Sequence, residues 1–424
     1  MKYLYALLAF GCCFFMNAQN HHFILNDTIV KLDTVVVSSL RMSPERMPET
    51  KKNTVYSGKK NEVLKLSSFN ANLTTNNARE VFSRVPGVNI WENDGSGVQI
   101  NVGVRGLSPN RSWELNVRQN GFDVSADVFG YPEAYYNPPL EAVASIELIR
   151  GGAALQYGPQ FGGMLNYVLK RENTKKFSFV TQNTVGSYNL MSSYNAIGGK
   201  LAKFSYYAYN HSRSADGWRV NSQYKVRNTH LFLEYAFTEN TKLSAEYTNM
   251  NYELHQGGGL TDGQFNENPR QSLRDRNWFG VPWNVFSLNF DTKISERLSS
   301  NTKFFGLVGE RNSVGFTATP NMPDAINPTS NEYTNRRVDR DFYENFGLEN
   351  RNLLNYTLGD IENNLAFGVR LYRANTIRNQ QGLGTTASDY DLSVEGIYPR
   401  ALDFLTNNVA VFAENQFKIT DKFS

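Results

Sequence analysis

Arginine and tryptophan side chains gather in the irregular segments of this sequence, and arginine is the residue best suited to hold a carboxylate. A planar guanidinium donates two parallel hydrogen bonds to a carboxylate, so a group of arginines could capture a ligand that carries several carboxylates. For any single arginine, an ion pair between loops or contact with an anionic lipid is the better explanation. The candidate ligand-binding residues are Arg111, Trp113, Arg219, Arg274, Arg276, Arg336 and Arg337.

The other residue types that commonly do chemistry form no recognisable site. The histidines are His21, His22, His211, His230 and His255, and none has metal-ligand spacing within a strand or helix. The sequence contains no Gly-x-Ser-x-Gly nucleophile motif, no phosphate-binding loop and no His-Glu-x-x-His motif. We therefore expect no catalytic residues, no metal site and no cofactor, and we predict that the protein is not an enzyme.

Charge and composition exclude several classes of protein. Lys and Arg number 43 and Asp and Glu number 40, so the net charge of +3 disfavours a nucleic-acid partner. The mean hydropathy is −0.47, and the single long apolar run lies at the N-terminus, which excludes a bundle of transmembrane helices. An aromatic-rich chain that is polar on average still fits a transmembrane β-barrel, whose strands alternate polar and apolar residues.

The first 53 residues read as an export signal followed by a flexible arm. Lys2 precedes an apolar run, which predicts a signal peptide over 1–18, cut after about Ala18. The arm, 19–53, contains one β-like run, Asp33, Thr34, Val35, Val36 and Val37. An isolated short strand can add to the sheet edge of another protein, although it could also be the first strand of the next domain.

Residues 54–171 predict a compact α+β domain. Asn77 is a plausible helix cap, and Pro86 ends the helix that follows it. Strands are expected at 88–91 and 98–104, joined by an Asn-Asp-Gly-Ser-Gly turn. Two more strands are expected at 145–150 and 163–170, with a short proline-initiated helix before the first of them.

Residues 172–424 predict an antiparallel transmembrane β-barrel, because segments of about ten residues alternate in polarity to the end of the sequence. Short and long connections also alternate, which a soluble β-sandwich, the alternative fold, has no reason to show. The ten expected strands are 176–186, 189–198, 201–211, 228–237, 242–253, 283–292, 298–308, 342–353, 361–372 and 409–419.

The size of the α+β domain suggests that ten strands are not the whole barrel. Ten tilted strands enclose a barrel about 20 Å across, whereas a domain of this length is over about 30 Å wide. About twenty-two strands would hold it. We therefore expect a C-terminally truncated chain with about ten of twenty-two strands; the alternative is a small barrel with an external domain.

Two stretches of the α+β domain carry a family resemblance. Val104 to Pro109 and Arg150 to Tyr167 resemble the plug signatures of TonB-dependent outer-membrane receptors, in particular the ferric dicitrate receptor branch, and Asp33 to Val37 resembles the TonB box. The segment from Arg118 to Asp123 departs from the usual Val-Asp-Gly spelling. The residues that carry the plug resemblance are Arg105, Gly106, Arg150, Gly151, Gly152, Tyr157, Gly158, Gly162 and Gly163.

This resemblance implies import of a ferric chelate, such as ferric citrate or another siderophore, into the periplasm. TonB and its inner-membrane energising complex would be the partners that act on residues 33–37. The protein would reside in the bacterial outer membrane as a monomer, in contact with its lipid and lipopolysaccharide. Two alternatives remain: a plugged oligosaccharide importer that works with a surface lipoprotein, and a surface-binding barrel that transports nothing.

Overall fold

The computed structural model places residues 41–424 in one compact unit. The predicted signal peptide and residues 33–37 lie outside the part of the chain that the structure describes, as do Gly151, Gly152 and Gly158. Among the described residues, no helix has the length and apolarity needed to cross a membrane. The described residues are 44–56, 61–68, 71–83, 85–128, 131–133, 135–150, 156–157, 162–172, 174–359, 361–385 and 390–419.

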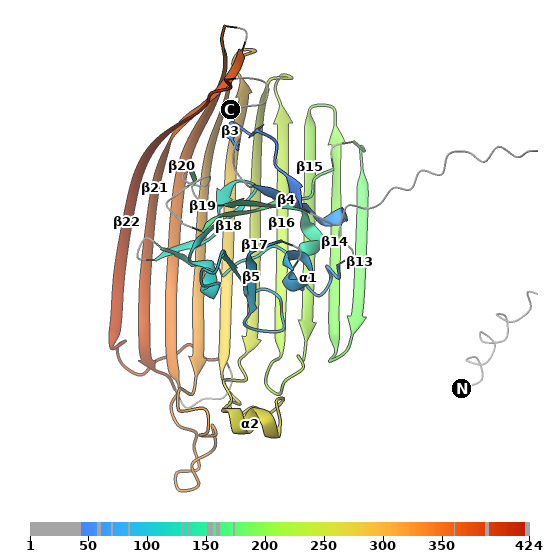
Figure 1. Ribbon diagram of the computed structural model, residues 1–424. Coiled ribbons are helices and arrows are strands. Elements are labelled where there is room, and N and C mark those ends of the chain that lie inside the picture. The colour runs from blue at the N-terminus through green and yellow to red at the C-terminus, as the bar shows by residue number, and fades with distance from the viewer. Residues whose placement is uncertain are drawn as a thin grey trace, which may run out of the picture. The chain divides into compact units, whose positions relative to one another are not determined.

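The C-terminal part is a ten-stranded antiparallel sheet in which every strand pairs with its neighbours in sequence. We call this sheet the wall (Figure 1). Its strands are β13 (Ser178–Gly186), β14 (Leu190–Leu201), β15 (Phe204–Ala215), β16 (Tyr224–Ala236), β17 (Thr241–His255), β18 (Trp278–Lys293), β19 (Leu298–Gly315), β20 (Arg337–Leu358), β21 (Ile361–Leu383) and β22 (Arg400–Gln416).

The prediction of ten antiparallel strands is confirmed, but most strands extend further than the sequence pattern indicated. The connection expected over 309–341 shrinks to 316–336, and the one expected over 373–408 shrinks to 384–399. The added residues are mostly polar, for example in Arg311–Ser313, so they carry no apolar alternation that would mark them as strand. Backbone pairing continues there because a ladder of hydrogen bonds needs no apolar face.

The wall has a short-turn end and a long-loop end. Turns such as 202–203 and 237–240 join strands at the short-turn end, and the loops 216–223, 256–277 and 316–336 and the connection between β21 and β22 join them at the long-loop end. The loop 256–277 contains the short helix α2 (Asp262–Glu267). This helix begins with a capping box formed by Thr261 and Gln264.

Side chains alternate between the two faces of the wall. In β16, Val226, His230 and Phe232 are buried, whereas Leu231 and Tyr235 are about 45% exposed on the other face. The same outer face exposes large apolar side chains along most of the sheet, among them Phe290, Phe304, Leu348, Leu371 and Val411. So broad an apolar face suits a hydrocarbon environment.

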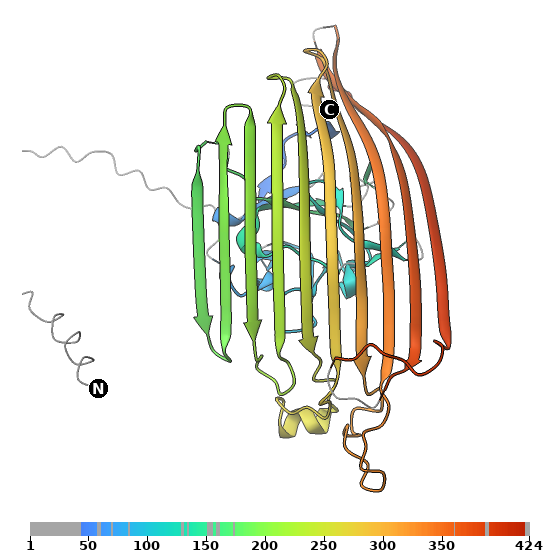
Figure 2. The same cartoon turned by 180° about the vertical axis from the view of Figure 1, so that it is seen from behind.

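Residues 44–172, which we call the plug, pack on the inner face of the wall; Figures 1 and 2 show them from opposite sides. The central sheet has the order β1-β4-β11-β12-β7-β8. The elements of the plug are β1 (Glu45–Arg46), β2 (Thr50–Lys51), β3 (Thr54–Val55), β4 (Glu62–Lys65), η1 (Leu66–Ser68), α1 (Ala78–Phe82), β5 (Val88–Glu92), β6 (Ile100–Val104), η2 (Asn110–Ser112), β7 (Leu115–Gln119), β8 (Phe122–Asp123), β9 (Ala126–Val128), β10 (Tyr131–Glu133), η3 (Leu140–Ala142), β11 (Val143–Arg150) and β12 (Gly163–Leu169).

The helix cap and the hairpin predicted for the plug are present in the structure. The Asn77 side chain accepts a hydrogen bond from the Arg79 amide at 3.1 Å and starts α1, and β5 and β6 form the predicted hairpin. One expectation differs: pairing begins at Glu45, in β1, well before the boundary expected at residue 54. The sequence pattern does not indicate these strands, because β1, β2 and β3 have only two residues each and are too short to show alternation.

The core lies between the plug and the wall. Phe122 of the plug meets Phe305 of β19 at a ring-centroid distance of 6.3 Å, and Tyr135 meets Trp283 of β18 at 6.0 Å. The Trp283 ring nitrogen also donates to the Val124 carbonyl at 3.1 Å. Because wall and plug share these aromatic contacts, the plug is held against specific strands rather than loosely enclosed.

Candidate functional site

A cavity of about 910 Å³ opens at the long-loop end between the plug and the loops of the wall. We call it the loop-end cavity. Its floor is the β5–β6 turn, Asn93–Gly95, and its sides come from the loops 216–223 and 256–277 and from the ends of β18 and β19. Four arginines (Arg79, Arg111, Arg219, Arg311), His255 and the rings of Tyr135, Trp218 and Phe279 line it, against two carboxylates, Glu92 and Asp94.

Arg111 lines this cavity from a left-handed turn of the plug. Arg111 has a φ of 53°, in the left-handed region, and its amide donates to the Asn101 side chain at 2.8 Å. Its guanidinium lies 5.9 Å from the ring centroid of Trp113 and 6.0 Å from that of Tyr135. The guanidinium therefore lies close to two aromatic rings of the plug, at distances where a cation–π contact is favourable.

The other cavity arginines are partly engaged. Arg79 pairs with Glu92 at 3.1 Å, and its side chain is 63% exposed, so an anion could compete for it. Arg311 pairs with Asp341 at 3.2 Å. Arg219 donates to the carbonyls of Gly257, Gly258 and Gln271, and burial lowers its pKa. Arg219 therefore shapes the cavity wall by joining two loops.

A buried ion cluster joins the plug to the middle of the wall. Arg118 of β7 donates to Glu349 of β20 at 2.9 Å and lies 3.1 Å from Asp123. Glu349 also accepts from Arg351 at 2.9 Å and from Arg370 at 3.0 Å, and Arg370 pairs with Asp123 as well. Three cations thus share two carboxylates across the interface, in a region with almost no solvent.

Tyr157 connects this cluster to the β2–β3 hairpin of the plug. Its carbonyl accepts from Arg118 at 2.9 Å and from Arg370 at 3.0 Å. Its hydroxyl lies 2.5 Å from the Tyr56 hydroxyl and 3.0 Å from that of Thr54. The Arg351 guanidinium lies 3.9 Å from its ring centroid. One residue therefore touches the β2–β3 hairpin, the plug sheet and the wall.

Comparison with known proteins identifies the plug. Residues 62–164 match the family described as the TonB-dependent Receptor Plug Domain. This segment is a TonB-dependent receptor plug domain. It is followed by an antiparallel strand wall like that of solved receptors, so the expected fold is confirmed.

Three solved structures share this fold. The unliganded ferric citrate transporter FecA is 21% identical, with a TM-score of 0.69 over 85% of this chain. The ferripyoverdine receptor of the Pseudomonas aeruginosa outer membrane is 14% identical, with a TM-score of 0.67 over 92%. The ferric-catecholate import receptor Fiu from E. coli K12 is 14% identical, with a TM-score of 0.61 over 86%.

The chain spans about half the length of the receptors it matches. It covers 54% of FecA, 54% of the ferripyoverdine receptor and 58% of Fiu.

The plug signature residues have structural roles in this receptor fold. Arg150 pairs with Glu62 inside the plug rather than with the wall. Arg105 and Gly106 both have positive φ, 53° and 80°, in the turn after β6. A Cβ at Gly162 would lie 2.5 Å from the Glu114 carbonyl oxygen, and Gly163 has a φ of 114°, so both positions require glycine.

Of the seven predicted ligand-binding residues, only Arg111 and Arg219 line the loop-end cavity. Trp113 stands beside Arg111 and is 40% exposed. Arg337 pairs with Asp339 at 3.0 Å, and Arg336 is buried. Sequence reasoning missed Arg79 and Arg311, because the first lies in α1 and the second in the part of β19 that the pattern did not extend to.

Arg274 and Arg276 bind loops together. Arg274 donates to the carbonyls of Ala318 and Thr319 at 2.7 and 2.9 Å. Arg276 forms a bidentate pair with Asp324, at 3.0 and 2.7 Å, and lies 4.0 Å from the ring centroid of Tyr333. Both are at most 5% exposed, so they hold loop 256–277 against loop 316–336.

Proposed function

We propose that this protein is a TonB-dependent receptor that imports an anionic ferric chelate across the outer membrane. The observation that carries the proposal is the loop-end cavity, where four arginines outnumber two carboxylates and aromatic rings form part of the lining. Guanidinium groups suit the carboxylates of a ferric hydroxycarboxylate such as ferric citrate. The three similar structures are a ferric citrate transporter, a ferripyoverdine receptor and a ferric-catecholate import receptor, which agrees with iron-chelate cargo.

The proposed location is the bacterial outer membrane, reached through the predicted signal peptide, 1–18. The broad apolar outer face of the wall supports it, since this face would meet lipid acyl chains and its loop-side rim would meet lipopolysaccharide. The short-turn end would then face the periplasm and the long-loop end the medium. We propose a monomer with no nucleic-acid partner.

Different residues would bind the chelate and receive the pull of TonB. Arg111, Arg79 and Arg311 would bind the carboxylates of the chelate, with Tyr135 and Phe279 packing against its apolar parts. The β5–β6 turn at the floor of the loop-end cavity would transmit the presence of bound chelate to the rest of the plug. TonB, driven by the inner-membrane energising complex, would pair with Asp33 to Val37 and pull on the plug from the periplasm.

Binding of ⁵⁵Fe-citrate to purified protein tests the capture step. The double variant Arg79→Gln, Arg111→Gln should weaken binding by at least about tenfold, because each lost charge-assisted hydrogen bond contributes about 1.5–3 kcal/mol. Arg337→Gln, whose partner Asp339 lies away from the cavity, is the matched control.

Two outcomes would contradict the proposal. Binding of neutral oligosaccharides in place of iron chelates would favour the plugged sugar importer that works with a surface lipoprotein. Binding of ferric citrate with no energy-dependent uptake would favour the surface-binding barrel that transports nothing.

A further inference from the structure

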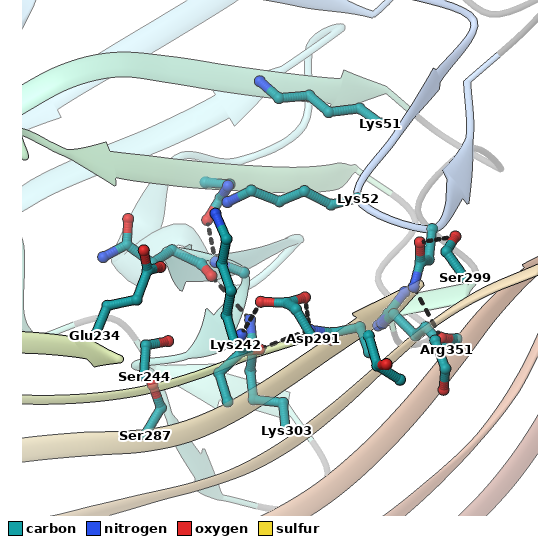
Figure 3. A pocket seen from close by; sticks show the side chains of 18 of the residues that line it. Lys51, Lys52, Glu234, Lys242, Ser244, Ser287, Asp291, Ser299, Lys303 and Arg351 are labelled. Carbon is teal, nitrogen blue, oxygen red and sulfur yellow. Dashed lines mark hydrogen bonds between the residues drawn. The ribbon is translucent and has the colours of Figure 1, made fainter. Parts of the chain in front are cut away.

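Lys303 and Arg351, on the inner face of the wall, have partners within the protein. Figure 3 shows both beside a cavity of about 440 Å³ that the wall shares with the β2–β3 hairpin. Lys303 donates to the Asn120 carbonyl of the plug at 2.9 Å, and Arg351 pairs with Glu349 at 2.9 Å. The outer face of the wall has no plug against it, so a charged side chain there needs another kind of partner.

A row of polar side chains crosses this outer face from β13 to β18. Its members pair directly from strand to strand: Thr181, Asn195, Asn210, Thr229, Asn249 and Asn284. Several bond to each other as well; for example, the Asn249 amide donates to Asn284 at 2.9 Å. We call this row the collar.

The next outward row, on the short-turn side of the collar, is apolar. It contains Phe179, Ile197, Ala208, Leu231, Tyr247, Phe286, Gly306 and Phe346. Lipid tails offer no hydrogen bonds, so polar side chains are unfavourable among them. The change from apolar row to collar therefore marks the loop-side edge of the lipid-facing surface.

Arg373 of β21 lies on the apolar side of this edge. It pairs directly with Phe346 on one side and with Asn407 of β22 on the other. Its side chain is exposed, and within the described part of the chain it forms no ion pair and no hydrogen bond. Arg370, which points inward from the same strand, pairs with two carboxylates. Glu344, the outward acid of β20, lies one row nearer the loops and forms no ion pair with Arg373.

A groove of about 310 Å³ lies beside Arg373 on the outer face. Arg373 and Asn407 line its loop-side end, in one row with Phe346. The row on the short-turn side is apolar and consists of Phe304, Leu348, Leu371 and Val409. The groove thus has a cationic end and an apolar end.

Stacked rings keep one side of the groove in place. The rings of Phe304 and Phe346 lie 6.5 Å apart with 10° between their planes, and Phe286 packs against both at 6.0 and 6.3 Å. Gly306 makes room for this cluster, since a Cβ there would lie 2.4 Å from the Phe286 ring. Side chains that are already ordered lose little conformational entropy when a ligand lies against them.

The two ends of the groove suit an amphiphile with an anionic head. A guanidinium can donate two parallel hydrogen bonds to a phosphate, and the Asn407 amide can donate to a further oxygen of the head group. The apolar row suits an acyl chain. In the proposed orientation the loop-side edge faces the outer leaflet, where lipid A carries phosphates on its sugars together with several acyl chains.

We propose that Arg373, Asn407 and the groove beside them form a binding site for one lipid A molecule of the outer leaflet. A phosphate of the lipid would lie against Arg373 and Asn407, and one acyl chain would lie along the rings of Phe304 and Phe346. This inference rests on the proposed outer-membrane location and orientation, and it is independent of the cargo.

Titration of the purified, delipidated receptor with diphosphoryl lipid A, read by native mass spectrometry, tests the site. Arg373→Gln should weaken binding of the first lipid by at least about tenfold, because a charge-assisted hydrogen bond is lost. Arg373→Lys should recover part of the affinity, since it restores the charge without the second parallel bond. Arg297→Gln, at an exposed arginine in the β18–β19 turn of the short-turn end, is the matched control and should bind like the natural protein.

A cycle with dephosphorylated lipid A shows whether Arg373 meets the phosphate itself. Removing the phosphates should weaken binding to the natural protein, and Arg373→Gln should then cause little further loss. The melting temperature of Arg373→Gln in detergent should equal that of the natural protein, because the arginine has no partner among the described residues.

Two results would overturn the inference. The first is equal affinity of Arg373→Gln and the natural protein for diphosphoryl lipid A. The second is Arg373-dependent binding of phosphatidylglycerol that is tighter than binding of lipid A, which would assign the groove to a glycerophospholipid. Either result would leave the proposed import function standing if ferric citrate still binds, whereas lipid A binding that depends on Arg373 supports the site whichever cargo the loop-end cavity takes.

Discussion

Arg118 of the plug and Glu349 of β20 form an ion pair of 2.9 Å whose side chains are 0% and 2% exposed. It links residues 231 positions apart in sequence, and Arg351 and Arg370 share the same carboxylate. A buried carboxylate that serves three guanidinium groups is costly to remove, because the cations left behind stay desolvated and unpaired. This pair is therefore a buried polar attachment of the plug to the described wall.

Glu349→Gln should loosen the plug. The substitution keeps the side-chain volume but leaves Arg118, Arg351 and Arg370 short of a negative partner, at a cost of about 3–5 kcal/mol. The expected result is faster protease cleavage within the plug in detergent, at temperatures where the wall stays intact. Glu296→Gln, whose side chain is 87% exposed, is the control and should change nothing. Equal cleavage of both variants would contradict the role of the cluster.

Tyr157→Phe should free the β2–β3 hairpin without breaking the ion cluster. It removes the hydroxyl that lies between Thr54 and Tyr56 but keeps the carbonyl that Arg118 and Arg370 use. We expect a loss of about 1–2 kcal/mol and faster amide exchange in residues 50–56. Tyr188→Phe, at an exposed turn, is the control. Unchanged exchange in the hairpin would argue against Tyr157 as its anchor.

Arg276→Lys should release loop 316–336. Lysine cannot reproduce the two parallel hydrogen bonds to Asp324, and the contact with Tyr333 weakens as well. Limited proteolysis should cut this loop several-fold faster, while the melting temperature of the wall changes little. Arg337→Lys, in a more exposed pair with Asp339, should leave the cleavage rate unaltered.

Glu141→Gln should change the pH dependence of stability. Burial raises the pKa of Glu141 in the plug, although Arg213 and Lys170 oppose the shift. A raised folded-state pKa means that ionised Glu141 destabilises the folded protein. This loss of stability is absent at pH values below the pKa of Glu141 in the unfolded chain, about 4.3. It is complete at pH values above the pKa of Glu141 in the folded protein.

The glutamine variant should therefore melt higher than the natural protein at pH 8, and the difference should vanish as the pH falls to about 4. Thermal unfolding in detergent at both values measures it. A gain that is equal at the two pH values would mean that ionisation of Glu141 is not the cause.

Local chemistry explains which parts of the fold were predictable. The alternation of Leu231 and Tyr235 with buried neighbours marks strand β16 directly, and Asn77 marks the start of α1. Side-chain types alone also indicated that arginines would matter at the long-loop end. These features depend on a few neighbouring residues, so a sequence displays them.

The partners of the arginines were not predictable in the same way. Arg274 reaches the carbonyls of a loop more than forty residues away, and Arg118 reaches another element of the fold altogether. Arg111 and Arg276 look alike in sequence, yet the first lines a cavity and the second is 4% exposed in a loop contact. Only the register of the wall strands and the packing of the plug decide between these roles.

Uptake by cells that produce a variant without residues 33–37 tests the central claim most directly. The natural protein and the deletion variant are produced in iron-limited cells, and ⁵⁵Fe-citrate is measured both on the surface and inside. The account predicts unchanged surface binding at the loop-end cavity and complete loss of energy-dependent uptake in the variant. Uptake at the natural rate without these residues would contradict TonB-dependent import.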